Sequence, residues 1–215
     1  MCARSARCPV SAALEGAVEL LDRSLAYTRV VLADVRPDLL DRPTPCSGWD
    51  LARLLAHMED GLDAFSEAAS GRVEVDPVPP TDTRVEALRE KACALLGAWT
   101  AARPVGPVPV EVGGVGLDAP LLVATAALEI TVHGWDVGQA TGRCPPLPDD
   151  LAGGLLAIAE HVIDPGDRGP RFATPRPVPA GAAAGDRLLA WTGRTPVHMT
   201  GPRRLKTANP PRVGA

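Results

Sequence analysis

The chain has 215 residues, which is enough for one domain with a full hydrophobic core and a small appendage. Hydrophobic residues make up 46% and charged residues 22%, a balance typical of globular proteins that argues against general disorder. The net charge of −4 offers no basic surface, so we expect neither nucleic acid nor an anionic membrane as partner. Aromatic residues make up only 3%, so the core must be built from Leu, Val and Ala, which favours helices over a β-sandwich.

Five cysteines are spread along the chain without a C-x-x-C pair: Cys2, Cys8, Cys46, Cys93 and Cys144. Their odd number and wide spacing are typical of reduced thiols, and not of a disulfide framework or a zinc knuckle. No apolar segment follows the N-terminal arginines, and no apolar run reaches membrane-spanning length. We therefore expect a cytoplasmic protein.

Apolar residues at helical spacing predict two helices in the first part of the chain. In residues 13–35 leucines and valines recur at steps of three, four and seven, and the helix should stop near Arg36 because a proline follows. Residues 46–65 repeat this pattern, with Ser47 and Asp50 as the expected capping pair at the helix start.

A linker, a third helix and a hairpin are expected next. Residues 71–80 indicate a linker, and residues 81–102 an amphipathic helix. The predicted inward residues of this helix are Val85, Leu88, Ala92, Leu95 and Trp99. The Val-, Pro- and Gly-rich residues 104–116 indicate a short strand or hairpin. Asp118 should cap a fourth helix that ends at Gly142. The pattern predicts an all-α, up-down four-helix bundle with one longer crossover.

Two weaker segments follow this bundle. Residues 148–163 indicate a helix diluted by glycines, and residues 185–193 a short helix. We therefore divide the chain into a bundle at 11–142, a helical extension packed on it at 143–196, and a basic, Pro-rich tail at 197–215 that we expect to be mobile.

The fourth predicted helix carries the most informative residues. It is apolar nearly all round over residues 121–132, yet it contains Glu129, His133 four residues later and Asp136 three residues beyond. A lone ionised carboxylate in such surroundings costs several kcal/mol or takes up a proton. The pattern therefore indicates a compensating cation.

The second predicted helix offers a partner for this face. His57 lies on the shoulder of its apolar stripe, and Asp50 lies near the same line two turns earlier. Antiparallel or diagonal packing would bring His57 toward Glu129 and His133. Two imidazoles and one carboxylate with open positions are the donor set of a catalytic metal site, which Asp136 and Asp50 would support from behind. A hydrogen-bonded shoulder histidine and an ordinary helical Glu–His pair are the alternatives, because the spacing has no fixed-motif specificity.

Three blocks of the chain carry a resemblance: PTPCSGWDLARLLAHM (43–58), LEITVHGWDVGQATGR (128–143) and GDRLLAWTGRTP (185–196). They resemble an actinobacterial branch of the DinB / mycothiol-dependent maleylpyruvate isomerase superfamily. Its typical pattern is a PTPC-x-x-WD helix start followed by a histidine, and an acidic residue four positions before HGWD. The blocks occur in the same order and span most of the chain.

The resemblance implies a DinB-like four-helix bundle and a divalent metal bound by His57, Glu129 and His133, although many relatives carry Asp at the acidic position. It also implies a low-molecular-weight thiol such as mycothiol as cosubstrate, activated by the metal. Zinc is favoured, and nickel and iron suit the same donors. The isomerase has a larger C-terminal domain that contributes a basic residue to its site, whereas only a short segment follows the bundle here. Maleylpyruvate isomerisation itself is therefore not expected.

The leading hypothesis is a metal-dependent thiol transferase or isomerase that acts on a small electrophilic metabolite. Two alternatives stay open: a thiol-independent cyclase, lyase or hydrolase of a biosynthetic pathway such as secondary metabolism, and a non-catalytic metal-binding scaffold. The residues do not identify the substrate or the residues that bind a cosubstrate, and dimerisation through a bundle face is also left open.

Other residues with functional chemistry have two interpretations each. Cys46 is either a site thiol or a residue that packs its turn, and we favour packing. Trp49 and Trp135 are interpreted as core anchors before substrate-stacking residues, and His161 and His198 as surface or tail residues. Four arginines are candidates for an anion clamp, with no spacing that singles one out: Arg143, Arg171, Arg187 and Arg194.

Overall fold

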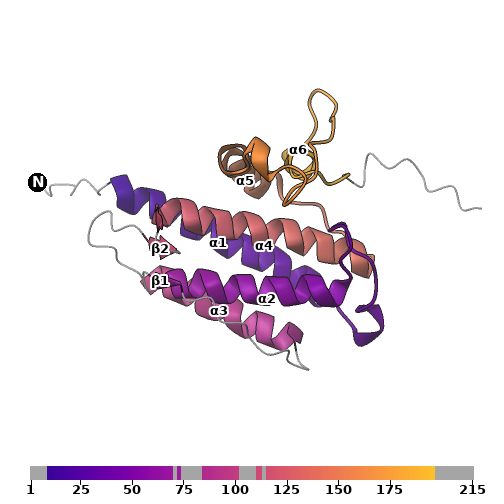
Figure 1. The fold of residues 1–215 in the computed structure, drawn as a ribbon, viewed down its shortest axis with the longest axis horizontal. Helices are drawn as coiled ribbons and strands as arrows, with labels where there is room; N and C mark the ends of the chain where they lie inside the picture. The colour runs from indigo at the N-terminus through magenta and orange to yellow at the C-terminus, as the bar shows by residue number, and fades with distance from the viewer. Residues whose placement is uncertain (1–8, 70–71, 74–83, 102–109, 113–114, 197–215) are drawn as a thin grey trace, which may run out of the picture.

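The computed structural model describes residues 9–69, 72–73, 84–101, 110–112 and 115–196. Four long helices form a bundle, and two shorter helices lie along one side of it (Figure 1). The helices are α1 (Pro9–Leu32), α2 (Leu51–Ala68), α3 (Arg84–Ala101), α4 (Ala119–Thr141), α5 (Asp149–Val162) and α6 (Ala184–Trp191), with 3-10 turns η1 (Pro37–Leu39) and η2 (Pro165–Asp167). The predicted DinB-like bundle with a small helical C-terminal segment is confirmed.

Three short strands accompany the helices: β1 (Arg72–Val73), β2 (Val110–Val112) and β3 (Val115–Leu117). β2 and β3 pair antiparallel, with Val112 opposite Val115, and form the hairpin predicted before the fourth helix. β1 pairs parallel to β2, with Arg72 opposite Glu111. The predicted linker at 71–80 therefore contains a strand, and its other residues lie outside the described part of the chain.

The described contacts fix the direction of α3 relative to α2. Arg84 forms an ion pair with Glu59, and Trp99 Nε1 donates a 2.9 Å hydrogen bond to the Phe65 carbonyl. The residue numbers of the two helices rise together, so α3 runs in the same direction as α2. The longer crossover that the sequence predicted therefore lies between these two helices.

Close packing of α4 against α1 depends on two glycines one turn apart. A Cβ on Gly134 would lie 2.4 Å from Thr28 Oγ1, and a Cβ on Gly138 would lie 2.6 Å from the Arg143 carbonyl and 3.2 Å from Val31. The Thr28 hydroxyl donates a buried 2.9 Å hydrogen bond to the Ile130 carbonyl. Glycine at 134 leaves room for α1, and glycine at 138 leaves room both for Val31 of α1 and for the Arg143 carbonyl in the connection that follows α4. The opposite side of α4 then faces α2.

The helix ends mostly follow their sequence signals. The Asp118 side chain accepts from the backbone N–H three residues on, at 3.2 Å, and Gly142 ends α4 with φ 82°. At the start of α2 the predicted pair is wrong, because Asp50 alone caps the helix and accepts from Arg53 N at 2.8 Å. Ser47 lies in the preceding turn, three residues before the cap.

Helices α1 and α3 depart from their predicted bounds and burial only slightly. α1 begins at Pro9 and ends at Leu32, earlier at both ends than the predicted 13–35. In α3 the residues Leu88, Leu95 and Trp99 are buried as predicted, whereas Val85 and Ala92 are half-buried.

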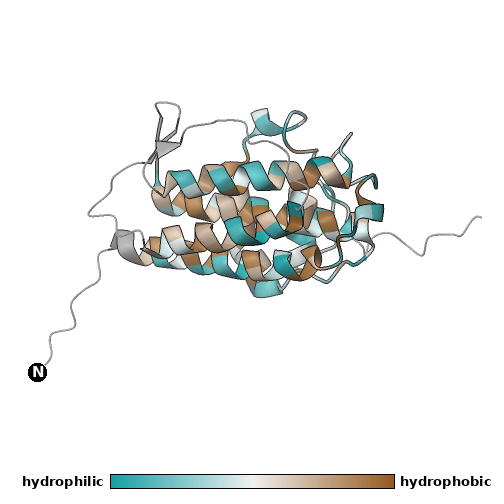
Figure 2. Ribbon diagram, turned by 90° about the horizontal axis from the view of Figure 1, so that it is seen from below, coloured by the Kyte–Doolittle hydropathy of each residue, from teal (hydrophilic) through white to brown (hydrophobic). Residues whose placement is uncertain are grey.

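The core lies between the four long helices, and hydrophobic and hydrophilic residues alternate along them (Figure 2). α4 is buried on nearly all sides, as its apolar sequence predicted. α5 packs against α4 and α1, and α6 packs against α5. The domain division at residue 142 stays a prediction. No helix in the described residues is long and apolar enough to cross a membrane.

Candidate metal centre

Three of the residues singled out from the sequence converge where α2 meets α4. Ligand atoms of His57, Glu129 and His133, called here the candidate metal group, all lie within 4.8 Å of one another. His133 Nε2 lies 3.2 Å from Glu129 Oε2, and the two imidazole rings meet edge to face with centroids 5.0 Å apart. Two ligands of one tetrahedral zinc ion are about 3.3 Å apart. The spacing therefore fits a shared ion, and the assignment of these residues as ligands stays a prediction.

The three members of the group are unequally covered. The Glu129 side chain is 26% exposed and the His133 side chain 12%, whereas His57 is exposed. Glu129 is therefore more exposed than the sequence analysis predicted from the apolar residues around it. It is Asp136, with a fully buried side chain, that matches the predicted acid in apolar surroundings.

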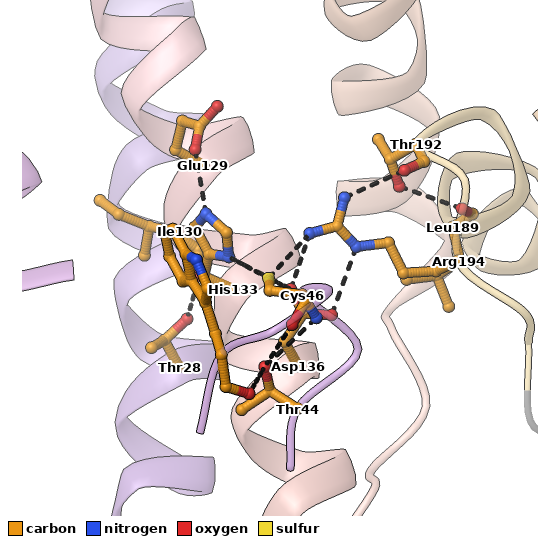
Figure 3. Close-up of polar contacts among 11 residues, drawn as sticks. Thr28, Thr44, Cys46, Glu129, Ile130, His133, Asp136, Leu189, Thr192 and Arg194 are labelled. Carbon is orange, nitrogen blue, oxygen red and sulfur yellow. Dashed lines mark hydrogen bonds and ion pairs between the residues drawn. The ribbon is translucent and has the colours of Figure 1, made fainter. Parts of the chain in front are cut away.

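Asp136 connects the group to the C-terminal segment (Figure 3). Its Oδ2 lies 3.1 Å from His133 Nδ1 and accepts a 2.7 Å hydrogen bond from Arg194 Nη2, while Oδ1 accepts from Arg194 Nε at 3.3 Å. Burial raises the pKa of Asp136, but Arg194 and His133 outweigh it and hold that pKa below its usual value. An ionised carboxylate only accepts, so His133 Nδ1 donates to it and Nε2 faces Glu129. Asp136 thus contacts an imidazole as the sequence analysis expected.

Cys46 also reaches this site, from the turn before α2. Its Sγ donates to Asp136 Oδ2 at 3.3 Å and lies 3.8 Å from His133 Nδ1 and 3.7 Å from Arg194 Nη2. The interpretation of Cys46 as a turn-packing residue is therefore incomplete. Its sulfur, His133 and Asp136 form a second set of clustered donor atoms. The guanidinium of Arg194 already supplies a cation there, so the candidate metal group is the better place for a metal ion.

The structure separates Asp50 from this role. Asp50 is exposed, and its carboxylate caps α2. It therefore does not support the metal ligands in the way that the sequence analysis predicted. Trp49, interpreted as a core anchor, is half-buried and lies edge-on to the His57 ring with centroids 5.1 Å apart. Trp135 is 5% exposed and is a core residue as expected.

The pKa values describe how the group is charged without a metal. Partial burial of its ring lowers the pKa of His57, and the neighbouring His133 lowers it further. Burial also lowers the pKa of His133, but hydrogen bonds to Asp136, Cys46 and Glu129 outweigh it and raise that pKa well above its usual value. Burial raises the pKa of Glu129, and both histidines bring it below its usual value. His133 therefore carries a proton that a divalent cation would replace, with the carboxylate already ionised.

The candidate metal group lies in a cleft of about 1220 Å³. Its walls come from α1, α2, α3 and α4, with Glu129 and His133 among the lining residues, and from the connections that contain Cys46, residues 169–173 and Arg194. Of the four candidate arginines, Arg171 and Arg194 line this cleft. Arg194 forms an ion pair with Asp136. Arg143 instead pairs with Asp34 at 3.1 Å.

The remaining predicted positions are peripheral. His161 is exposed in the last turn of α5, as expected for a surface residue, and His198 lies outside the described residues. Arg194 could not be chosen from the sequence, because nothing in the GDRLLAWTGRTP block shows that the chain returns to α4 after α6. The signal was that this block carried the family resemblance.

The fold and this cluster define a DinB-like helical bundle with a candidate metal-binding group between two of its helices. Residues 21–138 match the family described as the mycothiol maleylpyruvate isomerase N-terminal domain, and the chain belongs to this family. Similar proteins include two uncharacterized proteins of Mycobacterium tuberculosis, from strains CDC 1551 / Oshkosh and ATCC 25618 / H37Rv. Each is 31% identical over 173 residues, which covers 77% of this chain and 90% of the relative. No solved structure matches this chain significantly.

Proposed function

We propose that this protein is a divalent-metal-dependent enzyme that activates a low-molecular-weight thiol, of the mycothiol kind, for transfer to or isomerisation of a small electrophilic metabolite. The observation that carries the proposal is the convergence of two imidazoles and a carboxylate, from two helices, on a cleft. A structural metal site is usually closed by protein ligands, whereas three ligands beside open space suit a catalytic one. The partial exposure of Glu129 therefore favours an enzyme over a metal-binding scaffold.

The metal would act as a Lewis acid that lowers the pKa of a coordinated thiol toward neutrality. Glu129 supplies negative charge that offsets the ion. His133 presents Nε2 to the cleft because its Nδ1 is held by Asp136. Arg194 keeps Asp136 ionised, so the hydrogen bond to His133 persists when that imidazole is neutral. His57, at the exposed side of the group, completes the donor set.

The second candidate function is a thiol-independent Lewis-acid reaction on an oxygen substrate, such as that of a cyclase, lyase or hydrolase. Arg194 favours it, because both ends of its fork are committed to Asp136 and its Nη1 donates to the Thr192 carbonyl at 3.0 Å. A cation so engaged is a poor clamp for the carboxylate of a thiol cosubstrate.

Cobalt substitution tests the proposal. The Co²⁺-loaded full chain is titrated with N-acetylcysteine and with azide while its visible absorption is recorded. A sulfur-to-cobalt charge-transfer band that saturates with the thiol is expected, and it should disappear in His133→Ala and persist in His161→Ala, a matched histidine outside the cleft. A spectrum that responds to azide alone would support the thiol-independent reaction, and a cobalt spectrum unchanged by both probes would contradict catalysis at an open site.

A further inference from the structure

The cleft continues past the candidate metal group along the bundle axis. On α2 its lining residues include His57, Gly61, Ala64 and Phe65, which share one helix face. The run from His57 to Phe65 corresponds to about 12 Å at the helical rise. On α4, which is antiparallel to α2, the lining continues from Glu129 to Thr125 in the same direction, so the two helices extend the cleft together.

The chemistry of the lining changes along this run. Beyond the metal group the lining residues are mostly apolar, and we call this part the apolar lobe: Leu25, Gly61, Ala64, Phe65, Ala92 and Leu96. All six are half-buried, so part of their apolar surface faces the cleft. The charged lining residues within four positions of the lobe residues are Asp22 and Arg29, which are exposed, and Arg89, which pairs with Glu86 at 3.3 Å.

Gly61 makes the lobe deeper than an ordinary helix face would. A Cβ at this position would meet no heavy atom within 4 Å, so no neighbouring group requires glycine there, and its backbone φ is not positive. Glycine destabilises a helix interior relative to alanine. Gly61 lies one turn from His57, at a position where a side chain would project into open space. The glycine therefore leaves room in the cleft for a ligand.

We infer that the ligand of the candidate metal group carries an apolar body of alkyl or aryl type, which lies in the apolar lobe while its polar head reaches the metal. This inference rests on the proposed function for the polar head and extends it to the substrate class. A fully hydrophilic ligand would leave the half-buried apolar walls in contact with water, whereas an apolar body removes both surfaces from water.

The test is a series of straight-chain hydroxamic acids, which share one metal-binding head and differ in the length of the tail. Their dissociation constants are measured on the Zn²⁺-loaded full chain by calorimetry, from acetohydroxamic to decanohydroxamic acid. Affinity should rise about threefold to fourfold per methylene until the lobe is filled, and then level off. Equal affinities along the series would overturn the inference.

Two variants fill the lobe from different helices, so that a folding failure of one leaves the other. Gly61→Leu and Ala92→Leu should each abolish the gain from chain length while acetohydroxamic acid still binds. Gly97→Leu is the matched control, because a Cβ at Gly97 also meets nothing within 4 Å and this exposed residue of α3 does not line the cleft. It should keep the whole series. A gain from chain length that survives both filling variants would contradict the assigned location.

A metal-free arm separates this inference from the proposed function. Binding of 1-octanol and ethanol to the chelator-treated chain is compared by saturation-transfer NMR. If zinc does not bind but 1-octanol binds to the wild type and not to Gly61→Leu or Ala92→Leu, the metal proposal fails and the apolar lobe stands. If zinc and acetohydroxamic acid bind, but 1-octanol does not bind and the longer hydroxamic acids bind no more tightly than the shortest, the inference about the apolar lobe is wrong and the metal proposal stands.

Discussion

The two sides of α4 are built in opposite ways. Toward α1, Gly134 approaches so closely that a single methyl group would collide with Thr28, and one turn later Gly138 leaves room for Val31. Toward α2, the same helix presents Glu129 and His133 to a cleft. One side is specified by the absence of side chains and the other by their charge, and both arise from one stretch of sequence. The rigid side fixes where the polar side lies.

The polar side itself divides into a buried end and an open end. Asp136 is fully buried, and it is locked by Arg194 and His133. Glu129, seven residues earlier, keeps 26% of its side chain exposed and contacts His133 from the cleft. We infer that the buried carboxylate holds the structure and orients the imidazole, while the open carboxylate is available to a ligand.

The largest loss of stability is expected from Asp136→Ala, at the buried end. This change leaves the buried guanidinium of Arg194 without its partner, so the metal-free protein should lose about 3–5 kcal/mol of unfolding free energy. Urea denaturation followed by circular dichroism measures the loss. The double variant Asp136→Ala/Arg194→Met should recover much of it, because no uncompensated charge is left. A single variant as stable as the wild type would show that the ion pair is not buried in solution.

On the side toward α1, Gly134→Ala should destabilise the protein by about 1–3 kcal/mol, because the added methyl group forces Thr28 away. Gly153→Ala is the control in α5, where a Cβ meets nothing within 4 Å. It should be neutral or stabilise by up to about 1 kcal/mol through helix propensity. Thermal unfolding of both variants measures the difference, and similar shifts in the two would contradict the close approach of α1 and α4.

The pH dependence of metal binding is set by the protonation of His133. The pKa of His133 is well above its usual value without a metal, so the imidazole is protonated at neutral pH and a cation must displace that proton. Zinc affinity should therefore rise about tenfold per pH unit below the pKa of His133 and level off above it. Calorimetry in buffers of different ionisation enthalpy should detect about one proton released per ion at pH 7. No proton release would mean that His133 is already neutral.

The smallest effect on folding is expected from Glu129→Gln. The carboxylate is partly exposed, and His133 keeps its bond to Asp136, so the unfolding free energy of the metal-free protein should change by less than about 1 kcal/mol. Denaturation beside Asp136→Ala gives the comparison. If the Glu129 variant proved to be the more destabilised of the two, the division into a structural and a functional carboxylate would be reversed.

Much of the fold was predictable because it depends on local sequence. Helical periodicity identified all four long helices, and Asp118 and Gly142 marked the ends of α4. Ser47 misled because Asp50 is also a good cap and lies directly before the first helical residue. The parallel course of α2 and α3 depends on long-range pairs such as Glu59 with Arg84, which no local pattern contains.

The candidate site was predictable only in part, for the same reason. Glu129 and His133 share a helix face, so spacing alone placed them together. The contribution of His57 needed α2 to pack against α4, which amphipathicity suggested without fixing. Cys46 and Arg194 approach Asp136 from loops 90 and 58 positions away in the chain, and such contacts depend on where the whole chain returns.

Metal titration of the chelator-treated protein tests the central claim most directly. Zinc binding is measured by calorimetry and by elemental analysis after dialysis, for the wild type, His57→Ala and His133→Ala, with circular dichroism to verify that each is folded. One zinc ion per wild-type chain is expected, with neither variant retaining it. Stoichiometric zinc in both variants, or none in the folded wild type, would contradict the assignment of His57, Glu129 and His133 as a metal centre.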